Sequence, residues 1–269
     1  MMATRRQFLK TTCMAAAGGS IVSGSSASTS VAQARPTTFI LIHGAWHGGW
    51  CWRRVVPLLR RAGHEVYTPS LTGLGDRAHL NRPDINLDTH IQDVVMLVDM
   101  EELDDFVLVG HSYAGMVITG VADRMPSKIR RLVYLDAFLP ANGKSQLDYV
   151  VPERAAGIKK QGEETGMVNP LPLSLFGVTK PEDVAWASRH IVKQSFQTMA
   201  QPINLPNEAE TGRLRKTYVY CSSPATGSFD QFVAKVRNDP AWQFFEMKNG
   251  HDVMIIDPEG LAKVLLQTV

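Results

Sequence analysis

The feature that most constrains the fold of this 269-residue chain is a sharp turn between an apolar strand and a helix. Residues 110–115 (GHSYAG) follow the apolar run 106–109 (FVLV) and precede a helix-like stretch at 116–122. A turn that lifts a serine above the end of a buried strand strains the serine backbone, so its neighbours have to be small. This context predicts that Ser112 is a nucleophile.

The turn departs from the usual G-x-S-x-G pattern at one position. Ala114 stands where the second glycine is expected, and Gly115 follows directly. We expect the methyl group to be tolerated if the helix packs slightly further away. The alternative interpretation is an ordinary serine at the start of a helix, because serine is a favoured N-cap residue.

Two further segments favour the nucleophile. An apolar run at 38–42 leads into the glycine-rich loop 43–50 (HGAWHGGW), whose backbone N–H groups could stabilise an oxyanion. His251 lies in a turn after the strand-like segment 242–247. A loop, then a serine, then a histidine is the chain order of α/β-hydrolases.

Three stretches carry a resemblance to a known family: 43–52 (HGAWHGGWCW), 110–115 and 250–254 (GHDVM). They resemble the α/β-hydrolase branch that holds plant methylesterases, hydroxynitrile lyases and bacterial esterases, and the likeness covers nearly all of residues 37–269. Bacterial members include hydrolases of pyrethroid and carbamate esters. The resemblance therefore implies a serine carboxylesterase that cleaves a small, largely apolar ester through an acyl-enzyme.

Strand-like and helix-like segments alternate along the chain, which has an ordinary globular composition and enough residues for one domain at 35–269. Helices are expected at 50–61 and around 91–98. The alternation predicts an α/β fold with a mainly parallel sheet and helices on both faces. The expected strands are 38–43, 65–70, 105–110, 131–136, 216–221 and 242–247.

Residues 139–214 interrupt this alternation. We interpret them as a cap inserted over the serine, with a helix at 181–196. Leu147, Phe176 and Trp186 are expected to supply walls of the substrate pocket.

The remaining catalytic roles follow from position. His251 is predicted to be the general base. The acid is less obvious, since no carboxylate follows the strand 216–221 directly. Asp136 ends the strand after the nucleophile's strand and is favoured over Asp230, although Asp136 could instead cap a loop.

The backbone N–H groups of Ala45 and Tyr113 are expected to form the oxyanion hole. Trp46, Tyr113 and Phe138 are candidates for an apolar pocket, and as aromatic residues they could equally belong to the core. His43 and His47 have the H-x-x-x-H spacing, but both belong to the glycine-rich loop, and the sequence has no C-x-x-C or G-x-G-x-x-G spacing. We therefore predict neither a metal nor an organic cofactor.

The N-terminal sequence is typical of a cleaved twin-arginine export signal. Arg5 and Arg6 precede a weakly apolar stretch and an A-x-A site ending at Ala34. Residues 1–34 therefore predict a periplasmic or secreted protein with the twin-arginine translocase as partner; a disordered basic tail is the alternative. A lipoprotein anchor at Cys13 is poorly supported.

Removal of the three basic residues of this signal changes the formal net charge from +2 to −1. No basic cluster remains, so we expect no nucleic-acid partner. Cys51 and Cys221 are expected to be buried thiols, with a single disulfide as the alternative.

Three other functions compete with an esterase. Hydroxynitrile lyases carry a threonine where Gly44 stands and a lysine where Asp252 stands. A haloalkane dehalogenase would need an aspartate at position 112. A ligand-binding homologue without turnover is the alternative of a different class, and hydrolysis of p-nitrophenyl esters distinguishes it.

Overall fold

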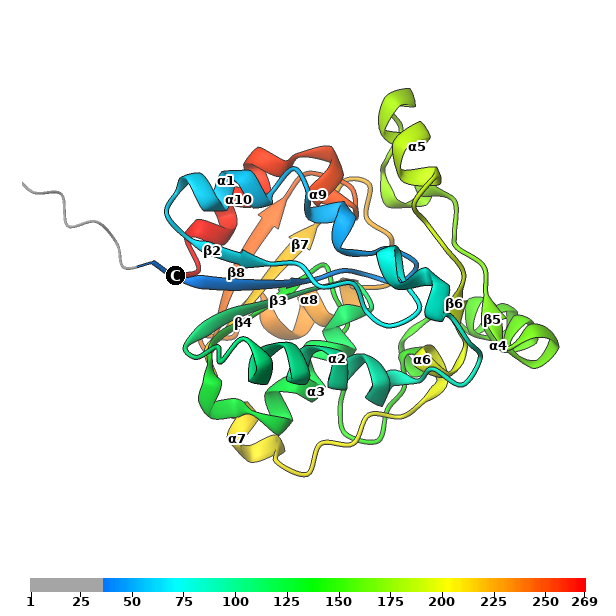
Figure 1. Ribbon diagram of the computed structural model, residues 1–269, viewed down its shortest axis with the longest axis horizontal. Helices are drawn as coiled ribbons and strands as arrows, with labels where there is room; N and C mark the ends of the chain where they lie inside the picture. The colour runs from blue at the N-terminus through cyan, green and yellow to red at the C-terminus, as the bar shows by residue number, and fades with distance from the viewer. Residues whose placement is uncertain (1–35) are drawn as a thin grey trace, which may run out of the picture. The chain divides into compact units, whose positions relative to one another are not determined.

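A six-stranded parallel sheet organises the computed structural model, which describes residues 36–269 (Figure 1). The strand order is β2-β1-β3-β4-β7-β8, so β1 lies inside the sheet and the chain crosses over several times. The α/β-hydrolase fold expected from the sequence is confirmed. The strands are β1 (Thr38–Ile42), β2 (Glu65–Tyr67), β3 (Phe106–His111), β4 (Ile129–Leu135), β7 (Lys216–Cys221) and β8 (Trp242–Met247).

Helices cover both faces of this sheet, as the alternation predicts. Figure 1 shows α1 (Val56–Arg61) and α10 (Pro258–Leu266) on one face and α2 (Leu87–Met100) and α3 (Ala114–Arg124) on the other. Because both faces are covered, the central strand β3 is buried at every residue. Two further helices are α8 (Asp230–Val236), between β7 and β8 in the chain, and the short α9 (Val253–Ile256), after β8.

Two predicted boundaries are wrong for reasons that involve proline. The expected helix at 50–61 is a short 3-10 turn, η1 (Gly49–Trp52), followed by the separate helix α1. Pro57 has no N–H to continue a helix from the preceding turn. The expected strand at 65–70 ends at Tyr67, and Pro69 likewise could not donate to the ladder.

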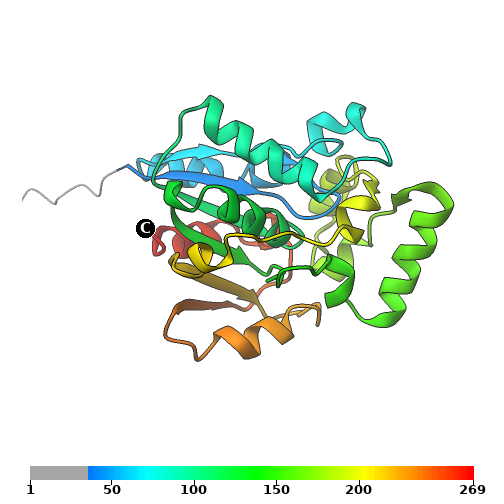
Figure 2. The ribbon, with the colours of Figure 1, turned by 90° about the horizontal axis from the view of Figure 1, so that it is seen from below.

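The segment between β4 and β7 forms a separate layer of short elements. Figures 1 and 2 show α4 (Pro152–Thr165) and the antiparallel pair β5 (Met167–Val168) and β6 (Gln194–Ser195) at the carboxyl ends of the parallel strands. This is the position expected for the cap. Its other elements are η4 (Gln146–Tyr149), η5 (Leu173–Phe176), α5 (Pro181–Ser188) and α6 (Gln197–Ala200). Helix α7 (Glu208–Gly212) falls within the predicted cap range but lies away from the cap, beside α3 (Figure 1).

The predicted helix at 181–196 is too long. Helix α5 ends at Ser188, and the backbone N–H of Val192 donates to the carbonyl oxygen of Trp46. Residues Gln194–Ser195 then pair with β5. Backbone groups that a longer helix would need are therefore engaged in tertiary hydrogen bonds.

No helix within residues 36–269 has both the length and the apolar character needed to cross a membrane. Cys51 and Cys221 are buried, free thiols, so the disulfide alternative is not realised. The predicted export signal at residues 1–34 lies outside the described residues.

Candidate active site

Ser112 lies in the strained turn that the sequence predicts. Its φ angle is +57°, a left-handed conformation that costs a non-glycine residue about 1–3 kcal/mol. Two neighbouring backbone bonds hold it there. Ser112 N–H donates to the Leu135 carbonyl oxygen (3.2 Å), and Phe138 N–H donates to the Ser112 carbonyl oxygen (3.2 Å). The turn therefore fixes the serine side chain at the end of β3.

Glycine is required on both sides of this turn. A Cβ atom at Gly110 would lie 2.7 Å from the Ala114 carbonyl oxygen, and one at Gly115 would lie 2.0 Å from the Phe138 carbonyl oxygen. The close approach to neighbouring backbone occurs at Gly115, one residue after the position where G-x-S-x-G has its second glycine. This explains why Ala114 is compatible with the turn.

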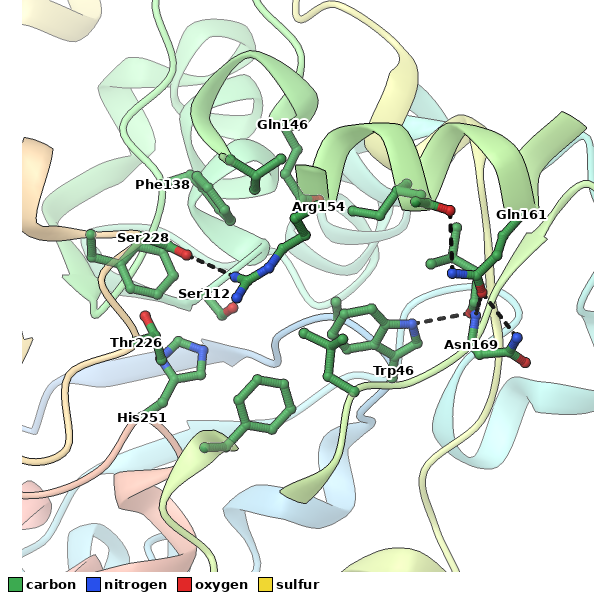
Figure 3. A pocket seen from close by; sticks show the side chains of 18 residues that line it. Trp46, Ser112, Phe138, Gln146, Arg154, Gln161, Asn169, Thr226, Ser228 and His251 are labelled. Carbon is green, nitrogen blue, oxygen red and sulfur yellow. Dashed lines mark hydrogen bonds between the residues drawn. The ribbon is translucent and has the colours of Figure 1, made fainter. Parts of the chain in front are cut away.

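His251 and Asp136 are in direct contact. His251 Nδ1 donates to Asp136 Oδ2 at 2.6 Å, and both side chains are buried. This bond keeps the imidazole proton on Nδ1 and leaves Nε2 free to accept one. His251 also lines the same cavity as Ser112 (Figure 3).

Asp136 is held rigidly at the end of β4. Its φ angle is +42°, its N–H donates to the Val219 carbonyl oxygen (2.7 Å), and its Oδ1 accepts from Cys221 N–H (3.2 Å). Burial raises the pKa of Asp136, and the hydrogen bond from His251 opposes that rise. The rival carboxylate, Asp230, is exposed and accepts instead from the Tyr220 hydroxyl (2.6 Å).

Aromatic rings fix the orientation of the His251 imidazole. Phe229 stacks on it with ring centroids 5.0 Å apart and an interplanar angle of 12°, and Phe176 lies at 5.3 Å. His111 packs at 4.4 Å and its Nε2 donates to the His251 carbonyl oxygen (3.1 Å). Rotation of the imidazole away from Asp136 would displace these neighbours.

The backbone N–H groups of Ala45 and Tyr113, the residues expected to form the oxyanion hole, form no hydrogen bond within residues 36–269, and both residues are buried. Unpaired buried N–H groups are rare in folded proteins. Ala45 lines the cavity with Ser112, and Tyr113 follows Ser112 in the chain. The arrangement suits a developing negative charge beside the serine.

The loop that carries Ala45 is tied to the cap through Trp46. This residue has a φ angle of +65°, and its N–H donates to Gln194 Oε1 (2.8 Å) while its indole N–H donates to the Val168 carbonyl oxygen (3.1 Å). These hydrogen bonds stabilise the strained backbone conformation of Trp46. They therefore fix the loop relative to β5 and β6.

A second buried network lies behind His251. His47 Nε2 donates to Asp252 Oδ2 (3.2 Å), and His47 Nδ1 lies 2.8 Å from the Ala45 carbonyl oxygen. Burial acts to lower the pKa of His47, but the Asp252 carboxylate and these hydrogen bonds raise it above its usual value. The pair thus connects the loop of Ala45 to the turn of His251.

One set of three potential metal ligands occurs within residues 36–269, with donor atoms of His111, His251 and Asp252 within 4.8 Å of one another. His111 Nε2 is already bonded to the His251 carbonyl oxygen, and His251 Nδ1 to Asp136. We assign this set to the positioning of His251.

A cavity of about 210 Å³ opens at Ser112 and His251. Trp46, Phe138 and Phe176 line it, as expected from the sequence. Most of its other walls come from the cap and from the loop after β7. The remaining apolar lining residues are Ala45, Val150, Ile158, Val168, Leu171 and Phe229.

Three residues expected in the pocket lie outside it. Trp186 packs against Trp50, with ring centroids 5.2 Å apart, and under the guanidinium of Arg54. The Tyr113 side chain points into the core, where its hydroxyl bonds His90 Nδ1 (2.9 Å). Leu147 packs against the hydrophobic core.

The sequence interpretation missed the polar wall of the cavity. Gln146, Arg154, Thr226 and Ser228 contribute to it (Figure 3). They come from the cap and from the loop after β7, and no motif in these segments distinguishes them from surface residues.

Comparison with known proteins identifies relatives across almost the entire described chain. The model of the alpha/beta hydrolase family matches residues 39–264. The carbendazim hydrolyzing esterase of Nocardioides sp. (strain SG-4G) is 41% identical over 240 residues, covering 84% of this chain and 97% of that protein. Methyl jasmonate esterase 1 of Vitis vinifera is 26% identical and is covered to 98%, with 88% of this chain aligned.

Solved structures show the same fold. An extracellular alpha/beta-hydrolase from a Paenibacillus species, described as homologous to tobacco salicylic acid binding protein 2, superposes with a TM-score of 0.75 at 24% identity. The superposition covers 86% of this chain and 98% of that one.

Proposed function

The chain belongs to the α/β-hydrolase family, and from this membership we propose that it is a serine-dependent esterase that cleaves carboxylic esters through an acyl-enzyme intermediate. One observation carries the proposal. Ser112, in a strained turn, shares a cavity with His251, whose far nitrogen bonds the buried carboxylate of Asp136 at 2.6 Å. This arrangement supports the roles of nucleophile for Ser112, base for His251 and orienting acid for Asp136.

In the proposed reaction Ser112 Oγ attacks the ester carbonyl carbon while His251 Nε2 takes the serine proton. The carbonyl oxygen becomes an oxyanion, and the N–H groups of Ala45 and Tyr113 stabilise it. His251 then returns the proton to the departing alkoxide. A water molecule, deprotonated by the same imidazole, attacks the acyl-enzyme and regenerates Ser112.

The relatives support ester substrates of modest size. Two of them are named for hydrolysis of carbendazim and for cleavage of methyl jasmonate. The cavity of about 210 Å³ and its mainly apolar walls suit a small ester or carbamate. Carbendazim and methyl jasmonate are therefore the first compounds to test on this chain.

Two features oppose the hydroxynitrile lyase alternative. Asp252 occupies the position of the lyase lysine, and it is fully buried, bonds His47 and does not line the cavity. A Cβ atom at Gly44, where the lyases have threonine, would lie 2.9 Å from Ser112 Cβ. A threonine there requires a shift of the nucleophile turn.

The test uses p-nitrophenyl esters and a fluorophosphonate label. The wild-type chain is expected to release p-nitrophenol and to gain the mass of the label on Ser112. Ser112→Ala is expected to lose both properties while retaining its melting temperature. Ser174→Ala, an exposed serine outside the cavity, is the control and should keep both.

Labelling that persists in Ser112→Ala would refute the nucleophile. A wild-type chain that binds esters without releasing alcohol, in a screen that includes carbendazim and methyl jasmonate, would favour the ligand-binding alternative.

A further inference from the structure

Arg154 places a positive charge on the wall of the active-site cavity. It lies in the first turn of α4, and its guanidinium points into the cavity, where it donates to Ser228 Oγ at 3.0 Å (Figure 3). Among residues 36–269 it forms no salt bridge. A guanidinium has five N–H donors, so most of its hydrogen-bonding capacity is unused.

Gln146 adds a second unpartnered group to the same wall. This side chain is 6% exposed and lines the cavity, and its buried Oε1, a hydrogen-bond acceptor, has no partner within the described part of the chain. Buried amides without partners are uncommon in native structures. The position of the amide on the cavity wall explains the exception if a ligand donates a hydrogen bond to this oxygen.

The surrounding residues do not neutralise this cation. No carboxylate lines the cavity, and the only other group there that could carry a positive charge is the imidazole of His251. The Asp136 carboxylate is buried behind that imidazole and engaged by it. Arg154 therefore offers several N–H donors to an oxygen atom that enters the cavity, whereas Gln146 Oε1 offers an acceptor.

We propose that Arg154 forms a subsite for an oxygen acceptor, most strongly a carboxylate, that the substrate carries in addition to its scissile ester. The planar fork of arginine matches a carboxylate. This inference rests on the proposed esterase function. It changes the expected substrate from a largely apolar ester to an ester with one polar end.

Two pairs of esters test the subsite, and within each pair a carboxylate replaces a methyl group. One pair is 4-acetoxybenzoate and 4-methylphenyl acetate, with the carboxylate on the alcohol side. The other is monomethyl terephthalate and methyl 4-methylbenzoate, with the carboxylate on the acyl side. The readout is the ratio of kcat/KM within a pair, in wild type and in variants of the full chain.

Arg154→Leu is expected to lower the ratio of at least one pair by about tenfold to a hundredfold, the usual effect of losing a hydrogen bond to a charged group. The change should lie mainly in KM, because the contact is made before and during the chemical step. Arg154→Lys should retain part of the preference. Lys159→Leu removes an exposed charge from the same helix and is the matched control.

An unchanged ratio in both pairs would overturn the proposal, as would an equal fall in Lys159→Leu. A second measurement is independent of turnover. Calorimetry on Ser112→Ala gives the Kd of 4-acetoxybenzoate and of monomethyl terephthalate, and adding Arg154→Leu should weaken at least one of them about tenfold or more. If the wild-type chain hydrolyses none of the esters but Arg154→Leu still weakens their binding, the esterase function is refuted and the subsite is not. If the Kd values are unchanged, the subsite is refuted.

Discussion

Asp136 Oδ2 accepts a hydrogen bond of 2.6 Å from His251 Nδ1, although the two residues are separated by 115 positions in the sequence. Each stands just past the end of a strand, Asp136 after β4 and His251 after β8. Strands β4, β7 and β8 are parallel neighbours, so their carboxyl ends meet at one edge of the sheet. The sheet therefore brings the carboxylate and the imidazole together.

We expect Asp136→Asn to lower kcat for ester hydrolysis by about 10³ to 10⁴ with little change in melting temperature. An amide at this position can hold the wrong tautomer of His251, in which Nε2 carries the proton and cannot take another from Ser112. Steady-state kinetics with a p-nitrophenyl ester measures the effect.

Asp230→Asn is the matched control and is expected to cost less than about tenfold. Its carboxylate is exposed and bonds Tyr220, not His251. The opposite ranking would make Asp230 the acid and Asp136 a structural residue. Near-full activity in both variants would mean that another group orients His251.

Gly115 and Ala114 provide a second matched pair. We expect Gly115→Ala to lower the free energy of unfolding by about 3 kcal/mol, because the new methyl group would meet the backbone of Phe138, which cannot rotate away. Ala114→Gly should cost less than about 1 kcal/mol, the difference in helix propensity. Urea unfolding measures both. A Gly115→Ala variant as stable as wild type would show that the turn is looser than described.

Local chemistry explains why much of the site could be predicted. The strained serine at position 112 and its flanking glycines are properties of a few neighbouring residues. The apolar strands around them are continuous because both faces of the sheet are covered. Asp136 could be favoured because a carboxylate that ends a buried strand needs a partner.

The errors arise where tertiary contacts decide the outcome. Trp186 is an aromatic residue in the cap, yet it packs against Trp50 outside the cavity. Tyr113 follows the nucleophile, but its side chain points to His90 in the core. Arg154 resembles a solvated helix residue in sequence, and only the packing of α4 against the loop of Ser228 directs it to the cavity.

The export signal is a prediction from residues 1–34 alone. Arg5→Lys with Arg6→Lys should retain the protein in the cytoplasm with its signal attached, because the transporter reads the arginine pair. Lys10→Arg, which leaves the pair intact, is the control. Cell fractionation with N-terminal sequencing checks both. Mature protein beginning at Arg35 in the periplasm of cells that lack twin-arginine transport would contradict the route.

Two buried neutral histidines predict how stability depends on pH. His90 Nε2 donates to the Thr72 carbonyl oxygen (2.9 Å), and its Nδ1 lies 2.9 Å from the Tyr113 hydroxyl. Burial lowers the pKa of His90 to about 4 and that of His43 to about 3. Both nitrogens of each neutral ring are satisfied, so a second proton would be buried without solvation.

The unfolded chain binds these protons near pH 6.5, whereas the folded chain binds them only near pH 4 and pH 3. The contribution of the buried neutral rings to the free energy of unfolding is therefore fully present above pH 6.5. It is lost progressively as the pH falls toward the pKa values of the folded protein. Between pH 6.5 and pH 5 each histidine should reduce the free energy of unfolding by about 2 kcal/mol.

His90→Gln isolates one of these contributions. The variant is expected to be less stable than wild type at pH 7, because it loses the bonds to Thr72 and Tyr113. Its further loss of stability between pH 7 and pH 5 should be about 2 kcal/mol smaller than in wild type, because the unfolded variant has one fewer proton to bind. Urea unfolding at both pH values measures the difference. His79→Gln, an exposed histidine, should reproduce the wild-type loss. An equal loss in wild type and His90→Gln would show that the pKa of His90 is the same in the folded and unfolded protein.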